Sequence, residues 1–344
     1  MKLGLQLGYW GAKPTDRFIE LAVIAEKLGF DIVCTAEAYG SDAFTPLAAI
    51  AARTTRIRLG TSIMQISART PTCAATTAMT LDHISDGRLC LGIGVSGPQV
   101  VEGWYGQPFH RPLERTREWL AIFRQVVARE APVVFEGRQY RLPYAGDRAT
   151  GLGKPLLSIT HPLRPRIPLF LGAEGPKNVE LAVREFDGWF PIFMPPQRFD
   201  IFEEQLRERR PGFEILATVD MALSGDRARA LQPLKRNIAL YVGGMGSKDE
   251  NFHKRMVERS GYAEAAQKIQ DLWLAGRQPE AVAAVPDELA EAISLVGPPE
   301  DLRARLAAWR QSPVTTLMIS RAATFEETVR NMEVLAAEMP ASAR

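Results

Sequence analysis

The alternation of predicted strands and helices that decides the fold is clearest in residues 56–94, which read RIRLGTSIMQISARTPTCAATTAMTLDHISDGRLCLGIG. Apolar residues dominate 57–66 and 89–93, as in buried β-strands, and the segment between these runs is predicted to be a helix. Six similar runs, at residues 2–7, 30–35, 167–172, 188–193, 214–223 and 315–320, bring the predicted strands to eight. Residues 16–28 show the helical spacing that separates them, with one apolar stripe and Gly29 as a helix-ending glycine.

Strands that alternate with helices form parallel sheets, and eight such units predict a closed (β/α)8 TIM barrel. The length of 344 residues suits one barrel with insertions, so we expect a single domain over residues 1–344. Residues 131–165 contain glycine, proline and basic residues without a convincing helix, and we expect an insertion that acts as a lid or covers a cofactor. Residues 224–298 are mostly helical and predict an expanded crossover before the last strand.

The composition is that of an ordinary globular protein, with 46% hydrophobic and 24% charged residues. A formal net charge of +2 does not indicate a nucleic-acid partner. No apolar stretch approaches the roughly 20 residues of a membrane span, and the first residues lack a cleavable leader, so we expect a cytoplasmic protein without a membrane partner. The three cysteines and four histidines lack the spacing of a disulfide framework or a metal site.

The active site of such a barrel lies at the C-terminal ends of its strands, where two small-residue turns open a helix. These turns contain Gly94, Ser96, Gly97, Pro98 and Gln99 after the fourth strand, and Ala173, Glu174, Gly175, Pro176 and Lys177 after the fifth. Glycine lets a backbone approach a ligand closely, and a helix N-terminus offers N–H groups to an anion. The turns therefore predict a phosphate site, unless the glycines serve only tight connections.

Glu37 follows the second predicted strand in an otherwise apolar setting. Burial favours the neutral form of a carboxyl group, so Glu37 is a candidate proton donor or acceptor, and the alternative is a capping or salt-bridged residue. Trp10, Tyr39 and Trp104 also lie near predicted strand ends. Together they predict walls for a flat cofactor or an apolar substrate, although each alone is compatible with a core position.

The sequence resembles the luciferase-like flavin and deazaflavin oxidoreductases. The most specific match is TLDHISDGR at residues 80–88, followed by LGIG at 91–94. GAEGPKN at 172–178, DGWF at 187–190 and the opening KLGLQ at 2–6 match in the same order and spacing. The similarity extends over nearly the whole chain and is closest to the branch that uses the deazaflavin coenzyme F420, including proteins similar to methylenetetrahydromethanopterin reductase.

This resemblance implies an oxidoreductase that binds F420, transfers hydride between the deazaflavin and an apolar small-molecule substrate, and forms a homodimer. It implies a cis peptide between Ser62 and Ile63 beneath the cofactor ring, with the turn from Gly94 to Gln99 beside the cofactor tail. Residues 173–177 would surround the phosphodiester, and Glu174 is expected to turn outward or to pair with Lys177 or an arginine.

Two departures from better-known members narrow the expected substrate and leave the role of Glu37 open. Glu37 stands where those members have an aspartate or a histidine. The turn at residues 95–99 reads VSGPQ and lacks the glutamate of the sugar-phosphate dehydrogenases, so a sugar phosphate is not expected. A two-component monooxygenase that uses reduced FMN, and a barrel that binds F420 without turnover, are the alternatives.

Overall fold

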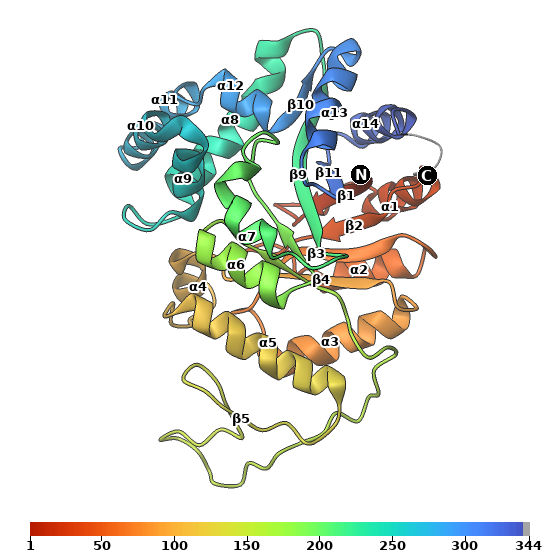
Figure 1. Cartoon of the computed structure of the whole chain (residues 1–344), viewed down its shortest axis with the longest axis vertical. Helices are drawn as coiled ribbons and strands as arrows, with labels where there is room; N and C mark the ends of the chain where they lie inside the picture. The colour runs from red at the N-terminus through yellow and green to blue at the C-terminus, as the bar shows by residue number, and fades with distance from the viewer. Residues whose placement is uncertain (340–344) are drawn as a thin grey trace.

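The computed structural model describes residues 1–339 and contains a closed barrel of eight parallel strands (Figure 1). The barrel strands are β1 (Lys2–Gly8), β2 (Ile32–Thr35), β3 (Arg58–Gln65), β4 (Leu89–Gly94), β7 (Leu169–Gly172), β8 (Gly188–Phe190), β9 (Glu214–Leu223) and β11 (Thr316–Ser320). They pair in the order β9-β11-β1-β2-β3-β4-β7-β8, and β8 pairs with β9 to close the barrel. The predicted TIM barrel and its eight strands are confirmed.

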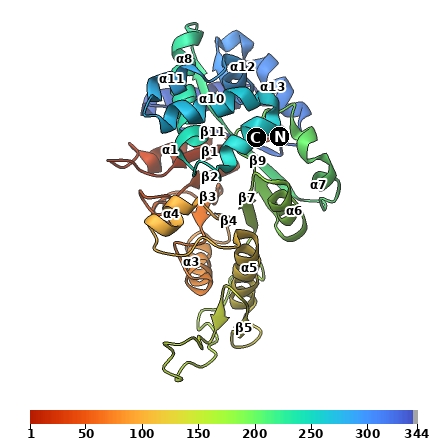
Figure 2. The ribbon, with the colours of Figure 1, turned by 90° about the vertical axis from the view of Figure 1, so that its left-hand side faces the viewer.

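Helices connect and cover these strands on the outside of the barrel (Figures 1 and 2). They are α1 (Phe18–Lys27), α2 (Phe44–Ala51), α3 (Pro71–Ile84), α4 (Pro98–Gly103), α5 (Pro112–Ala128), α6 (Pro176–Glu185), η1 (Phe199–Phe202), α7 (Glu203–Arg207), η3 (Pro299–Asp301), α13 (Leu302–Gln311) and α14 (Phe325–Ala337). The apolar stripe predicted for the first helix is seen in α1, where Leu21, Ala22 and Ala25 are buried. No helix within residues 1–339 is long and apolar enough to cross a membrane.

The interior of the barrel is packed with side chains. Its cluster consists of Ile32, Cys34, Cys90, Phe170, Phe190, Leu216 and Met318. Cys34 and Cys90 are buried and unpaired, as expected for thiols that act as small apolar residues. Because this cluster fills the barrel, a ligand must bind above it, where the strands end.

Residues 131–165 form an irregular arm without a helix, as predicted, but they are not a lid. The arm contains a short hairpin of β5 (Phe135–Glu136) and β6 (Arg141–Leu142), and it extends away from the barrel beyond α3 and α5 (Figure 1). Arg164 Nη2 lies 2.8 Å from Asp82 Oδ1, and His83 Nε2 lies 2.8 Å from the backbone oxygen of His161. These contacts hold the arm near the amino end of β4, so the expectation of a cover over the cofactor is wrong.

Residues 224–298 are mostly helical, as predicted. They form α8 (Arg227–Gly244), α9 (Phe252–Val257), η2 (Glu258–Tyr262), α10 (Ala263–Leu274), α11 (Gln278–Ala283) and α12 (Asp287–Ala292). The segment ends in a strand that the sequence analysis missed, β10 (Ser294–Gly297), which pairs in parallel with the second half of β9. Buried residues of α8 and α10, such as Ile238, Val242 and Ile269, give this part its own apolar cluster.

Candidate active site

A cavity of about 770 Å³ lies at the carboxyl ends of the barrel strands. The strand ends form one side of it, and α8 with the start of α9 forms the other. The cavity brings together eleven of the residues predicted from the sequence: Glu37, Tyr39, Ser62, Ile63, Gly94, Ser96, Gly97, Gln99, Trp104, Ala173 and Glu174. The crossover, rather than the arm at 131–165, therefore covers the mouth of the barrel.

Five predicted residues do not line this cavity: Trp10, Pro98, Gly175, Pro176 and Lys177. The ring of Trp10 packs against Phe18 of α1 instead, with 5.4 Å between the ring centroids. Gly175, Pro176 and Lys177 lie at the start of α6, directly after the lining residues Ala173 and Glu174. They can contact only a ligand that extends beyond the rim of the cavity.

A bulge in β3 projects into the cavity at Ser62 and Ile63. The register between β3 and β4 shifts between Thr61 and Met64, and the Ser62–Ile63 peptide is cis, as the family resemblance implied. Gln6 of β1 donates from Nε2 to the backbone oxygen of Ser62 over 3.0 Å. A Cβ on Gly94 would meet Ile63 Cδ1, so a larger residue at this position in β4 would have to displace the end of the Ile63 side chain.

Glu37 is buried and held by several donors. Arg69 Nη1 lies 2.8 Å from each carboxylate oxygen, and the backbone N–H groups of Gln65 and Ala43 donate over 2.9 and 3.2 Å. This geometry is that of the salt-bridged alternative, because the charge is compensated and the lone pairs are occupied. Gln65, by contrast, has a buried side-chain oxygen without a hydrogen-bond partner, and the residue lines the cavity.

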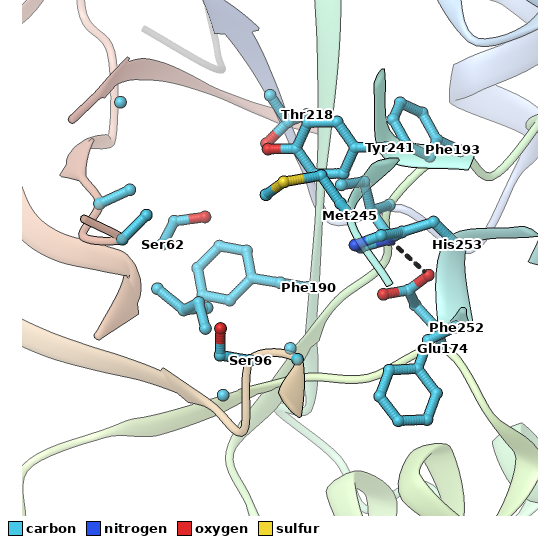
Figure 3. A pocket seen from close by; sticks show the side chains of 18 of the residues that line it. Ser62, Ser96, Glu174, Phe190, Phe193, Thr218, Tyr241, Met245, Phe252 and His253 are labelled. Atoms are coloured by element: carbon cyan, nitrogen blue, oxygen red, sulfur yellow. Dashed lines mark hydrogen bonds and ion pairs between the residues drawn. The ribbon is translucent and has the colours of Figure 1, made fainter. Parts of the chain in front are cut away.

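The turn after β7 begins a helix whose N-terminus has no side-chain cap. Gly175 is the N-cap of α6, and a Cβ there would meet no atom within 4 Å. Glu174 pairs with His253 of α9 rather than with Lys177, with 2.9 Å between Oε2 and Nδ1 (Figure 3). Its backbone oxygen accepts from Arg259 Nη1 over 3.1 Å. Pro176 has no N–H, and the N–H groups of Asn178 and Val179 donate to the backbone oxygen of Gly175. The turn thus presents open space, the backbone N–H of Lys177 and the nearby guanidinium of Arg259, a setting that suits an anion.

The far wall of the cavity is aromatic and was missed by sequence reasoning. Phe193, Tyr241 and His253 pack edge to face, with centroids 5.3 Å apart for Phe193 and Tyr241 and 4.8 Å for Tyr241 and His253 (Figure 3). Burial raises the pKa of Tyr241 above its usual range. Met245 and Phe252 also line this wall. Residues 241–253 carry no motif, so nothing in the sequence distinguished Tyr241, Met245, Phe252 and His253 from residues of an ordinary helix core.

Asp220 of β9 and Ser320 of β11 also line the cavity and were not predicted. A signal was present for Asp220, since it is the carboxylate that interrupts the apolar residues 215–223 of a predicted strand. Burial raises the pKa of Asp220 above the usual range of aspartate. Within residues 1–339 no group of three or more His, Cys, Asp or Glu side chains is arranged to hold a metal ion.

The comparisons with known proteins agree with this geometry. The sequence model of the luciferase-like monooxygenase family matches residues 4–316. A protein of Mycobacterium tuberculosis that is named as a coenzyme F420-dependent oxidoreductase is 51% identical over 344 residues, covering 97% of this chain and 99% of the relative. The 5,10-methylenetetrahydromethanopterin reductase of Archaeoglobus fulgidus is 26% identical over 335 residues, covering 92% of each chain.

A solved structure shows the same fold. The coenzyme F420-dependent tetrahydromethanopterin reductase of Methanopyrus kandleri superposes with a TM-score of 0.78 at 22% identity, and the match covers 98% of each chain. At that identity the likeness concerns the barrel and its elaborations rather than the substrate.

Proposed function

Because the chain belongs to the luciferase-like monooxygenase family, we propose that it is a coenzyme F420-dependent oxidoreductase acting on an apolar small molecule. The observation that carries the choice of cofactor is the 51% identity, over 97% of this chain, with the mycobacterial protein named as F420-dependent. When bound, the deazaflavin supplies or accepts the hydride. The protein supplies position, shape and the accompanying proton.

The residues around the β3 bulge fit a flat, hydrogen-bonding ring. Ser62 and Ile63 project into the cavity and provide a surface against which a ring can rest. The unpaired oxygen of Gln65 is an acceptor without a donor in the protein, and a deazaflavin has a ring N–H that can satisfy it. Glu37 holds the backbone of Gln65 through its carboxylate, so its role in this proposal is to position the ring site.

The tail of the cofactor would follow the two small-residue turns. Gly94, Ser96, Gly97, Pro98 and Gln99 would lie beside the tail, and Ala173, Glu174, Gly175, Pro176 and Lys177 would surround its phosphodiester. Two observations support this placement: the N-terminus of α6 has no side-chain cap, and the space beside Gly175 is open. The carboxylate of Glu174 is paired with His253, which reduces its repulsion of a phosphate.

The substrate would bind between the ring site and the aromatic wall. Tyr39 and Trp104 are 51% and 63% exposed while lining the cavity, so they lie at its entrance. Phe193, Tyr241 and Met245 form the opposite side. These side chains favour a substrate with an apolar body, because its burial is then driven by removal of apolar surface from water.

Turnover screening tests this proposal. Reduced F420 is mixed anaerobically with a panel of aldehydes, ketones, imines and activated alkenes, and appearance of the oxidised deazaflavin is followed by absorbance. We expect enzyme-dependent oxidation of F420 with at least one class. Oxygen-dependent turnover with reduced FMN alone would identify the monooxygenase instead. Tight F420 binding without turnover of any class would favour a carrier or sensor.

A further inference from the structure

A row of polar side chains crosses the mouth of the barrel from β9 to the β3 bulge. Ser320 of β11 lies opposite Gln6 of β1. The pairing of β11 with β9 matches Ile319 with Val219, which places Asp220 beside Ser320. All three polar residues line the cavity, and Gln6 continues the row through its 3.0 Å hydrogen bond to Ser62. The carboxyl group of Asp220 therefore lies on the same rim of the cavity as the predicted ring site at Ser62.

Asp220 differs from Glu37 and Glu174, the other carboxylates of the cavity, in having no arginine or histidine partner within the described residues. None of the ion pairs within residues 1–339 includes it, and the group that favours its ionised form is the neutral hydroxyl of Ser320. Burial raises its pKa, and the Ser320 hydroxyl opposes that rise only in part. A half-buried carboxyl group without a counter-charge favours its protonated form, which is the form that can donate a proton.

The groups that face Asp220 from neighbouring elements leave its carboxyl group without a counter-charge. Tyr241 of α8 is close enough to interact with it electrostatically, and burial keeps that phenol neutral. Ser294 of β10 lies opposite Asp220 in the strand pairing. The nearest cation along β11 is Arg321, whose Nε donates to the backbone oxygen of Leu7.

The other carboxylates of the cavity are already engaged. Glu37 is paired with Arg69 at 2.8 Å, and Glu174 is paired with His253 at 2.9 Å. Burial raises the pKa values of Tyr9 and Tyr241 above the usual range of a phenol, which makes both poor acids near neutral pH. Asp220 is left as the carboxyl group of the cavity that has a raised pKa and, within residues 1–339, no ionic partner.

We propose that Asp220 is the catalytic proton donor and acceptor of this site and that Ser320 positions its carboxyl group. The proposal rests on the proposed function. In the reduction of a carbonyl, the hydride forms the new C–H bond and the π electron pair moves to oxygen. The oxygen takes the proton from the Asp220 carboxyl, the deazaflavin leaves oxidised, and the carboxylate regains a proton from water. In alcohol oxidation each transfer is reversed.

The test compares Asp220→Asn with Asp200→Asn, an exposed aspartate of η1 outside the cavity. Protein labelled with ¹³C at the aspartate carboxyl carbons and saturated with oxidised F420 is titrated by NMR, and the Asp220 signal is identified by its loss in Asp220→Asn. We expect this signal to titrate above the range of the other aspartates. The F420 affinities of both variants should stay within about threefold of wild type, less than 1 kcal/mol.

Turnover of the fastest substrate found in the screen gives the second readout. Asp220→Asn should lower kcat by about 10²–10⁴-fold and remove one limb of the pH–rate profile, whereas Asp200→Asn should keep both. Ser320→Ala provides a variant that retains the acid. Loss of the hydroxyl that stabilises the carboxylate should raise the titration midpoint and move the same limb to higher pH.

Three results would overturn the assignment: titration of Asp220 in the ordinary aspartate range, an unchanged kcat in Asp220→Asn, or a rise in KM without a fall in kcat. If Asp220→Asn does not fold, the Asp220 signal is identified instead as the aspartate signal whose midpoint shifts in Ser320→Ala, and that midpoint in the wild-type protein decides the assignment. Failure of the wild-type protein to bind F420 would instead refute the proposed function. Normal F420 binding with an ordinary Asp220 titration would refute only the role of Asp220.

Discussion

The pairing of Glu37 with Arg69 allows a quantitative test of the structural role that we assign to Glu37. In Glu37→Gln the amide has one acceptor oxygen, yet three donor groups still face it: the guanidinium of Arg69 and the backbone N–H groups of Gln65 and Ala43. Removal of one partner of a buried pair costs about 3–5 kcal/mol. Arg69 keeps a second contact, 3.7 Å from Asp42, so we expect a loss of about 3 kcal/mol, near the lower end of that range.

Urea unfolding of the protein without cofactor measures this loss through a double-mutant cycle. Glu37→Gln, Arg69→Met and the double variant are compared with wild type. Because each single change leaves its partner buried and unpaired, the double variant should lose at least about 1 kcal/mol less than the sum of the single losses. Additive losses would show that the pair is not coupled. A fully stable Glu37→Gln protein that turns over about 10²–10⁴-fold more slowly would instead make Glu37 the general acid.

Three further predictions follow from the cavity and its surroundings. Gly175→Leu should fill the open space at the start of α6 and weaken F420 binding by about 1–2 kcal/mol, whereas unchanged affinity would place the phosphodiester elsewhere. Gly94→Ala should displace the Ile63 side chain and weaken F420 binding at least about tenfold. The control is Gly97→Ala, whose Cβ would have its nearest neighbour at 3.6 Å and which should weaken binding less. Equal losses of affinity in the two variants would contradict the packing described for the bulge. Ile159→Ser, on the arm at 131–165, should leave F420 affinity unchanged. A clear loss of affinity measured by calorimetry would support the interpretation of the arm as a lid over the cofactor.

The pH dependence of stability checks the state of Asp220 without any ligand. The folded protein keeps this proton to a higher pH than the unfolded chain does, so wild-type stability should fall as pH rises from the ordinary aspartate range through the raised pKa. Asp220→Asn lacks this proton and should not show that part of the decline. Identical pH profiles of unfolding for the two proteins would contradict the raised pKa.

The barrel could be predicted from the sequence because its signals are local. Each barrel strand is an apolar run between helical segments, and glycine marks the end of β4 at Gly94, beside Ile63, and the start of α6 at Gly175. The strands that were missed, β5, β6 and β10, have two to four residues and lie within segments that the sequence marks as irregular or mostly helical.

The position of the arm and the far wall of the cavity could not be predicted for a different reason. Composition marks residues 131–165 as irregular, but the Arg164–Asp82 pair that directs the arm joins residues 82 positions apart. An apolar helix face has the same periodicity whether it packs in a core or lines a cavity, so Tyr241 of α8 carried no local sign of its place. Glu37 could be located at the site from its strand, but its partner Arg69 lies 32 positions away in the sequence.

The most direct test of the central claim is a calorimetric comparison of F420 and FMN binding to the purified wild-type protein. The account predicts that F420 binds with a Kd of about 1 μM or tighter, roughly −8 kcal/mol, and at least about tenfold more tightly than FMN. Binding of FMN at least about tenfold more tightly than F420 would contradict the account and make the reduced-flavin monooxygenase the better description of this site.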